Sequence, residues 1–289
     1  MNLSELYRSF TEAFKDISDS PSVDAAILIC HCLGITRTQL VLSPNEKIPQ
    51  DKLEELMRIK AERENGEPVA YLTGERGFYE CVFSVSPDTL IPRADTETLV
   101  EEAVADIAEA FEDRTEVRIL DLCCGTGCIG ISVAKVLSEV FEKVHLVLSD
   151  VSEKAMVVCR KNAEELIEED NIEAKFNTGS LFEGLDDLVF DAVLSNPPYI
   201  ATSVIPTLEK QVQFEPILAL DGGADGLDFV RKIAAEAKKH LVPGGILQME
   251  IGYDQGKEAR AILRKEGYRE ISVIKDLEDC DRVVKAFLA

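Results

Sequence analysis

The feature that most constrains the fold is a regular alternation of short apolar runs with longer amphipathic spans between residues 117 and 288. Short β-branched runs predict strands, and apolar residues spaced three or four apart predict helices. Strands that alternate with helices form a mostly parallel sheet covered on both faces. We expect strands at 117–122, 143–149, 174–178, 190–194, 245–251, 270–275 and 282–288, and helices at 127–140, 152–167, 227–240 and 255–267. Before this alternation, Asp95 or Thr96 is expected to cap a helix that runs to about Phe111. The last two strands follow each other directly, which predicts one antiparallel strand.

The chain before this alternation has a different character. Leu3, Leu6, Phe10 and Phe14 recur at helical spacing. An apolar run at 23–33 and a second run with the helical period at 53–60 follow, and Asn65-Gly66 is the stop signal. We therefore expect an all-helical domain over residues 1–66. Residues 67–86 predict a β-hairpin linker, with strands at 69–73 and 78–85, and residues 87–289 form the α/β domain.

The strand at 190–194 is followed by Ser195-Asn196-Pro197-Pro198-Tyr199. The two prolines cannot continue a strand ladder, so the carbonyls of Asn196 and Pro197 can face outward as acceptors. The Asn196 side-chain oxygen and the Pro197 carbonyl could bind the two hydrogens of a planar NH2 group, while Tyr199 stacks on its plane. These acceptors would favour positive charge on the nitrogen and direct its lone pair. The motif predicts a catalytic site for an amino or amide group.

A glycine-rich turn precedes this motif. Residues 121–130 read Asp-Leu-Cys-Cys-Gly-Thr-Gly-Cys-Ile-Gly, so Gly125, Gly127 and Gly130 give the Gly-x-Gly-x-x-Gly pattern between a strand and a helix. Asp150 ends the next strand, where a carboxylate can accept both hydroxyls of a ribose. This pattern suits NAD as well as S-adenosylmethionine. Asp121 beside the turn and the NH2-binding motif favour S-adenosylmethionine, because an acidic site attracts a sulfonium and repels a pyrophosphate.

Charge and cysteine spacing restrict the partners. With 31 basic and 54 acidic residues, the net charge is -23, which disfavours binding to nucleic acid backbones. The eight cysteines include no paired Cys-x-x-Cys knuckles, so we predict no metal site. No apolar run approaches the ~20 residues of a membrane span. The sequence starts without a secretory signal, so we expect a cytoplasmic protein without a membrane partner.

Taken together, these motifs resemble the release factor glutamine methyltransferases, the family of protein-(glutamine-N5) methyltransferases. The resemblance covers nearly the whole chain and rests on Tyr71-Leu72-Thr73-Gly74-Glu75, Leu90-Ile91-Pro92-Arg93, residues 121–130, residues 195–200, Phe214-Glu215-Pro216 and Gly244-Gly245. It implies a Rossmann-like, seven-stranded S-adenosylmethionine-dependent methyltransferase domain. In that family a helical N-terminal domain helps to dock a peptide chain release factor, whose Gly-Gly-Gln glutamine is methylated.

The resemblance also implies roles for individual residues. The glutamine amide would be bound by Asn196, Pro197, Pro198 and Tyr199, and the cofactor by Cys123, Cys124, Gly125, Thr126, Gly127, Asp150, Ser180, Leu181 and Asn196. Two features depart from the family pattern. Cys123 and Cys124 stand where glycines are frequent, and Ser180-Leu181 stands where an acid usually binds the adenine amino group. The Ser180 hydroxyl or a backbone carbonyl would have to replace that acid.

Two other functions use the same motifs. An N6-adenine methyltransferase acting on DNA or RNA would present the same NH2 geometry, with a flipped base stacked on Tyr199. It would need a basic cleft and a target-recognition segment, and the sequence indicates neither. A non-catalytic binding module would not need the intact motif at 196–199.

Overall fold

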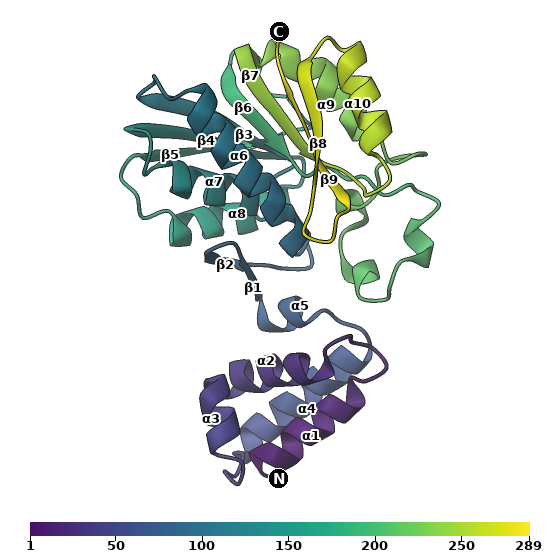
Figure 1. Cartoon of the computed structure of the whole chain (residues 1–289). Coiled ribbons are helices and arrows are strands. Elements are labelled where there is room, and N and C mark those ends of the chain that lie inside the picture. Colours follow the sequence, from purple (N-terminus) through teal and green to yellow (C-terminus); the bar gives the residue numbers. More distant parts are fainter. The chain divides into compact units, whose positions relative to one another are not determined.

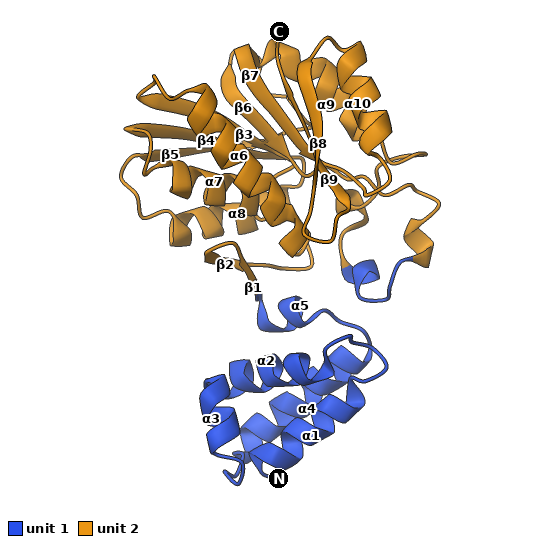
Figure 2. Cartoon of the chain, viewed as in Figure 1, with its two compact units in different colours: residues 1–75, 208–214 blue, residues 76–207, 215–289 orange.

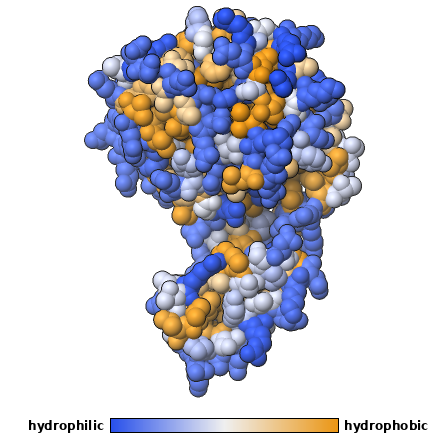
Figure 3. Space-filling model, in the orientation of Figure 1, coloured by the Kyte–Doolittle hydropathy of each residue, from blue (hydrophilic) through white to orange (hydrophobic).

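The computed structural model describes residues 1–289, and the chain forms two compact units (Figure 2). The first unit contains Met1–Glu75 together with Leu208–Phe214, and the second contains Arg76–Thr207 and Glu215–Ala289. No helix in the structure has the length and apolar character needed to span a bilayer. Hydrophilic side chains cover most of the visible surface, with apolar side chains gathered in small groups (Figure 3).

The first unit is helical (Figure 1), with α1 at Leu3–Ala13, α2 at Pro21–Leu33, α3 at Arg37–Leu42, α4 at Gln50–Glu64 and α5 at Val69–Thr73. Asn2 and Glu5 form a capping box that starts α1, and Gly34 ends α2 with a left-handed φ of 64°. Leu6, Phe10, Phe14, Leu28, Ile29 and Leu56 are fully buried at the centre. Helix α3 was not predicted, because its six residues are too few to show a helical period.

The hairpin is shorter than predicted, because the first predicted strand, 69–73, is the helix α5. Pro68 precedes its first turn, the Thr73 hydroxyl donates back to the Val69 carbonyl, and Gly74 stops the helix at a φ of 74°. Such a short apolar run suits a strand or a helix equally well, and packing against α2 and α4 selects the helix. The hairpin itself consists of β1, Glu75–Phe78, and β2, Cys81–Ser84.

The second unit is built on a seven-stranded sheet with β3 at Glu116–Leu122, β4 at Lys143–Asp150, β5 at Ile172–Thr178, β6 at Phe190–Ser195, β7 at Leu241–Glu250, β8 at Arg269–Lys275 and β9 at Asp281–Phe287. The strand order is β5-β4-β3-β6-β7-β9-β8. Neighbouring strands from β5 to β7 are parallel, and β9 is antiparallel to both of its neighbours. The predicted mostly parallel sheet with one antiparallel strand is confirmed.

Helices cover both faces of this sheet (Figure 1), and they comprise α6 at Glu97–Ala110, α7 at Cys128–Leu137, α8 at Glu153–Leu166, α9 at Asp228–Glu236 and α10 at Gly256–Lys265. Helices α6, α7 and α8 pack on the face that buries Ile119 and Leu146, and α9 and α10 pack on the face that buries Leu120 and Leu247. Short 3-10 helices occupy Ala94–Thr96, Ile205–Thr207, Val212–Phe214, Ile217–Ala219 and Ala237–Lys239. Successive residues of the buried strands point to opposite faces of the sheet and so belong to two hydrophobic cores, as expected for a sheet covered on both sides.

The centre of the sheet positions the site. Strand β3 lies between β4 and β6, and its last residue, Leu122, pairs with Ser149 of β4 and Ser195 of β6. The three strands are parallel, so their carboxyl ends reach the same edge of the sheet. The chain leaves β3 toward β4 on one side and later returns to β6 on the other, which makes this edge the switch point where ligands bind in such sheets. The residues that follow each strand, Cys123, Val151 and Asn196, therefore meet there.

Candidate active site

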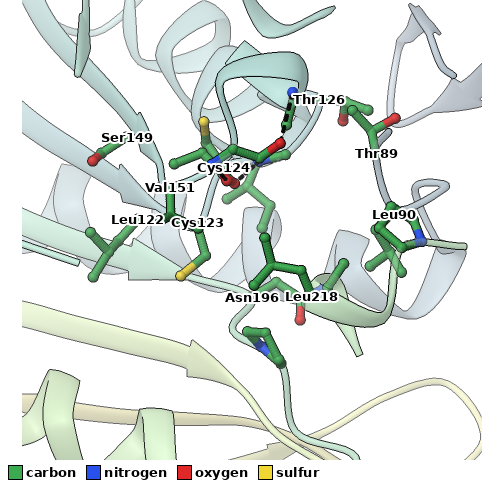
Figure 4. A pocket seen from close by; sticks show the side chains of 18 of the residues that line it. Thr89, Leu90, Leu122, Cys123, Cys124, Thr126, Ser149, Val151, Asn196 and Leu218 are labelled. Atoms are coloured by element: carbon green, nitrogen blue, oxygen red, sulfur yellow. Dashed lines mark hydrogen bonds between the residues drawn. The ribbon is translucent and has the colours of Figure 1, made fainter. Parts of the chain in front are cut away.

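A pocket opens at this edge, with about 1000 Å³ of empty space, part of it open to solvent. Small-molecule sites have volumes of ~300–1,000 Å³. All of its lining residues belong to the second unit. Figure 4 shows Thr89 and Leu90 on one side of the pocket and Cys123, Cys124 and Val151 on the other, with Asn196 and Leu218 between them.

The turn after β3 forms one wall, and its glycines have different roles. A side chain at Gly125 would meet no atom within 4 Å, so this glycine keeps the backbone open toward the pocket. A side chain at Gly127 would lie 2.9 Å from the Cys159 sulfur on α8. Gly127 does not line the pocket and instead lets the turn pack closely. Cys123 has a left-handed φ of 60°, a conformation that favours glycine and that a side chain rarely adopts.

Asp150 lies at the end of β4 and lines the pocket. Its Oδ2 accepts the Gly125 N–H at 2.9 Å, and its Oδ1 accepts the Ser152 N–H at 2.9 Å. Burial raises the pKa of Asp150, and these backbone hydrogen bonds oppose the rise. Each carboxylate oxygen keeps further lone-pair capacity, so Asp150 can accept two adjacent hydroxyls, as a ribose presents them.

Ser180 and Leu181 follow β5 and also line the pocket. The Ser180 backbone N–H donates to the Glu183 carboxylate at 3.1 Å, and the Ser180 hydroxyl makes no hydrogen bond within the chain. That hydroxyl is available to a ligand. Leu181 has a left-handed φ of 52°, so the backbone bends sharply at this wall.

Asn196 follows β6 and is half-buried in the pocket wall. Its Nδ2 donates to the Thr96 hydroxyl at 3.4 Å, which leaves Oδ1 as an acceptor. The Pro197 carbonyl accepts no hydrogen bond from the rest of the chain. Together they offer the two acceptors that an NH2 group requires.

The structure does not bring every predicted site residue into the pocket wall. Pro198 lines the pocket, whereas Pro197 and Tyr199 do not. The Tyr199 hydroxyl donates to Glu250 Oε1 at 3.1 Å, and its backbone carbonyl accepts the Gln255 side chain at 2.9 Å. Burial and the nearby Glu250 charge raise the pKa of Tyr199, so the phenol stays protonated as a donor. In this structure Tyr199 is anchored beneath the site.

Two segments of the pocket wall were not predicted to belong to the site. Residues 88–93 and 216–219 contribute Thr89, Leu90 and Leu218, and Glu215 joins the two segments. The buried Glu215 carboxylate accepts the Ile91 N–H at 3.0 Å and pairs with the Arg93 guanidinium. Both segments contain stretches that support the family resemblance, yet they lie 124 positions apart. Nothing in the sequence indicates that they meet.

The pocket suits S-adenosylmethionine. Apolar side chains of Leu90, Val151 and Leu181 can enclose the nucleoside, Asp150 can take the ribose, and Gly125 opens the turn. Residues 97–212 match the family model "Methyltransferase small domain". A methyltransferase from Pyrococcus furiosus has a similar fold, with a TM-score of 0.50 at 19% identity over 83% of this chain and 98% of that chain. The fold and site are those of an S-adenosylmethionine-dependent methyltransferase.

Similar proteins identify the family within this class of methyltransferases. Residues 5–74 match the "PrmC N-terminal domain". The chain is 37% identical to the release factor glutamine methyltransferase of Caulobacter vibrioides, over 98% of this chain and 96% of that one. It is 39% identical to the enzyme of the same name from Vibrio cholerae, over 92% and 89% of the two chains. The protein belongs to the family of the release factor glutamine methyltransferases.

Proposed function

We propose that this enzyme methylates a peptide chain release factor, on the side-chain amide nitrogen of the glutamine in its Gly-Gly-Gln motif. The names of the relatives support the release factor as substrate. The observation that carries the proposal is the pair of acceptors at Asn196 and Pro197, which follow β6 directly, with Asn196 in the wall of the cofactor pocket. We expect the reaction to take place in the cytoplasm, with the translation machinery.

The cofactor would be held by residues at the ends of three strands. Asp150 would accept the ribose hydroxyls, Cys124 and Gly125 would lie along the methionine portion, and Ser180 would face the adenine. When bound, S-adenosylmethionine supplies a sulfonium-activated methyl group, which the amide nitrogen attacks as the carbon–sulfur bond breaks and its electron pair returns to sulfur.

The residues of the motif address the poor nucleophilicity of an amide, whose nitrogen lone pair is delocalised into the carbonyl. Asn196 Oδ1 and the Pro197 carbonyl would each accept one N–H of the glutamine, which localises the lone pair and directs it out of the amide plane. Positive charge grows on this nitrogen during transfer, so both acceptors stabilise the transition state more than the bound substrate. The methylated nitrogen becomes acidic and loses its proton to water.

We propose that the helical domain over residues 1–66, which belongs to the first unit, docks the release factor. It exposes Val41 and Leu42 of α3, with 74% and 75% of their surfaces accessible. Leu40 and Val41 also line a groove in this unit with Tyr7 and Val23. Exposed apolar side chains beside a groove suit a protein partner.

The test offers release factor, unmethylated DNA and RNA in parallel, with methyl-labelled S-adenosylmethionine. Label is expected in the release factor, at the Gly-Gly-Gln glutamine, and a release factor with that glutamine changed to alanine should remain unlabelled. The nucleic acids serve as the alternative substrates. Label in nucleic acid adenine and none in the release factor would overturn the proposal.

A further inference from the structure

A buried carboxylate lies beneath the motif that binds the amide. Glu250 is the last residue of β7, whose neighbour in the sheet is β6, and Met249 pairs with Ser195. Only 1% of the Glu250 surface is exposed. The residue does not line the pocket, so it cannot contact a ligand there directly.

The Glu250 carboxylate is bordered by the hydroxyl groups of two site residues. Its Oε1 accepts the Tyr199 hydroxyl at 3.1 Å. Its Oε2 is buried and has no hydrogen-bond partner, so this oxygen can still accept a hydrogen bond from a neighbouring hydroxyl. Burial raises the pKa of Glu250, while Thr96 and the positive charge of Arg282 oppose the rise.

Thr96 contacts Asn196 and also influences the Glu250 carboxylate, whose pKa it lowers. It is 2% exposed and precedes the first turn of α6, yet its hydroxyl makes no helix-capping hydrogen bond. The hydroxyl instead receives the Nδ2 group of Asn196 at 3.4 Å. A hydroxyl has one hydrogen to donate, so its direction toward one neighbour decides what it offers the other.

We propose that Glu250 is a positioning residue that fixes which end of the Asn196 side chain faces the substrate. A carboxylate only accepts hydrogen bonds, so the Thr96 hydroxyl would donate its one hydrogen to the unpartnered Glu250 Oε2 and keep its lone pairs for the NH2 group of Asn196. Asn196 must then present Oδ1 to the pocket. The same carboxylate holds Tyr199, so one buried charge orients both polar side chains of the motif. The inference rests on the proposed function, in which the pocket receives an NH2 group.

The direction of the hydrogen bonds through Thr96 can be reversed by a substitution that keeps the size of the Glu250 side chain nearly unchanged. In Glu250→Gln, the new amide can donate to Thr96, whose hydroxyl can then donate to Asn196 Oδ1. The Asn196 NH2 group would turn toward the substrate NH2 group, and two donors would face each other. We expect kcat to fall by ~10-fold or more, because removal of one preorganised transition-state partner lowers kcat by about 10²–10³.

Thr96 provides a second, independent test. Thr96→Val removes the hydroxyl at constant shape and should also lower kcat by ~10-fold or more. Thr96→Ser keeps the hydroxyl and should retain kcat within about threefold of wild type. The double variant Thr96→Val, Glu250→Gln should lose less than the product of the two single losses, because the residues act through the same bond.

The experiment measures kcat and KM for the release factor, with S-adenosylmethionine affinity by calorimetry and thermal stability alongside. The matched control is Asp191→Asn on β6, a carboxylate that is 1% exposed, binds Arg114 and the Arg118 N–H, and lies outside the pocket wall. Asp191→Asn should lower stability and leave kcat unchanged. Glu250→Gln should lower kcat with cofactor affinity within about twofold of wild type.

Three results would overturn the inference: wild-type kcat in Glu250→Gln, parallel losses of kcat and cofactor affinity, or equal losses in Thr96→Ser and Thr96→Val. If Glu250→Gln does not fold, the Thr96 pair decides the question. Failure of the proposed function is recognised separately, because the wild-type enzyme would then leave the release factor unlabelled.

Discussion

Replacing Asp150 with alanine should weaken S-adenosylmethionine binding and also destabilise the unbound enzyme. The carboxylate accepts the Gly125 and Ser152 N–H groups at 2.9 Å each, and it lines the pocket where a ribose would lie. The substitution therefore removes a ligand contact and the brace that holds the turn after β3 against β4. These two effects can be measured separately.

The size of each effect follows from hydrogen bonds to a charged group, worth ~1.5–3 kcal/mol. Loss of the ribose contact should weaken binding by about 10-fold to 100-fold. Loss of the brace should reduce the free energy of unfolding by ~1–3 kcal/mol, since the backbone N–H groups lose an acceptor but remain near solvent. Asp150→Asn keeps one acceptor oxygen, so its affinity should lie between those of wild type and Asp150→Ala.

Titration calorimetry at a temperature where all three proteins are folded gives the affinities, and urea denaturation without cofactor gives the stabilities. Unchanged affinity in folded Asp150→Ala would refute the ribose assignment. Unchanged stability would show that the two backbone hydrogen bonds do not brace the turn.

Three further predictions address the pH dependence, the helical unit and substrate docking. Burial raises the pKa of Asp121 to about 7, and the Asp150 charge adds to the rise, whereas an unfolded aspartate titrates near ~3.9. Between these two pKa values the native state binds more protons than the unfolded state, so its stability falls as the pH rises. From pH 5 to pH 8, wild type should lose about 3 kcal/mol of stability relative to Asp121→Asn. If urea denaturation shows the same pH dependence of stability for both proteins, the prediction is wrong. Asp24→Ala should destabilise the enzyme by ~3 kcal/mol, because Arg63 is 2% exposed and loses its ion partner at 2.9 Å. A loss below ~1 kcal/mol in urea denaturation would show that the hydrogen bonds from Arg63 to backbone carbonyls stabilise its buried charge without Asp24. Val41→Ser with Leu42→Ser should raise KM for the release factor by ~10-fold or more without altering cofactor affinity, since burying each side chain contributes ~1.5–3 kcal/mol; an unchanged KM would exclude this surface from docking.

The sheet and the position of the pocket could be predicted because they depend on local patterns. The run 190–194, ended by two prolines, marks a strand end without any tertiary information. Asp150 likewise follows a recognisable strand. Parallel strands bring their carboxyl ends together, so Asn196 and Asp150 were expected at one edge of the sheet, as observed.

Other parts of the site depend on contacts between distant segments. The wall formed by Leu90 and Leu218 exists because Glu215 binds the backbone of Ile91, and no local pattern encodes that contact. The orientation of Tyr199 depends on Glu250 at the end of a different strand. Gly127 matches the cofactor motif, but its missing side chain accommodates Cys159. The helix α5 was missed because five residues carry too little periodicity to identify a helix.

The most direct test of the account compares wild type with Asn196→Ala in single-turnover methylation of release factor, followed by mass spectrometry of the peptide that contains Gly-Gly-Gln. Wild type should add one methyl group to the glutamine. Asn196→Ala should do so ~100-fold more slowly or worse, with cofactor affinity within about twofold of wild type, because the lost acceptor acts mainly in the transition state. A wild-type rate in the folded variant, or methyl groups on another residue, would contradict the account.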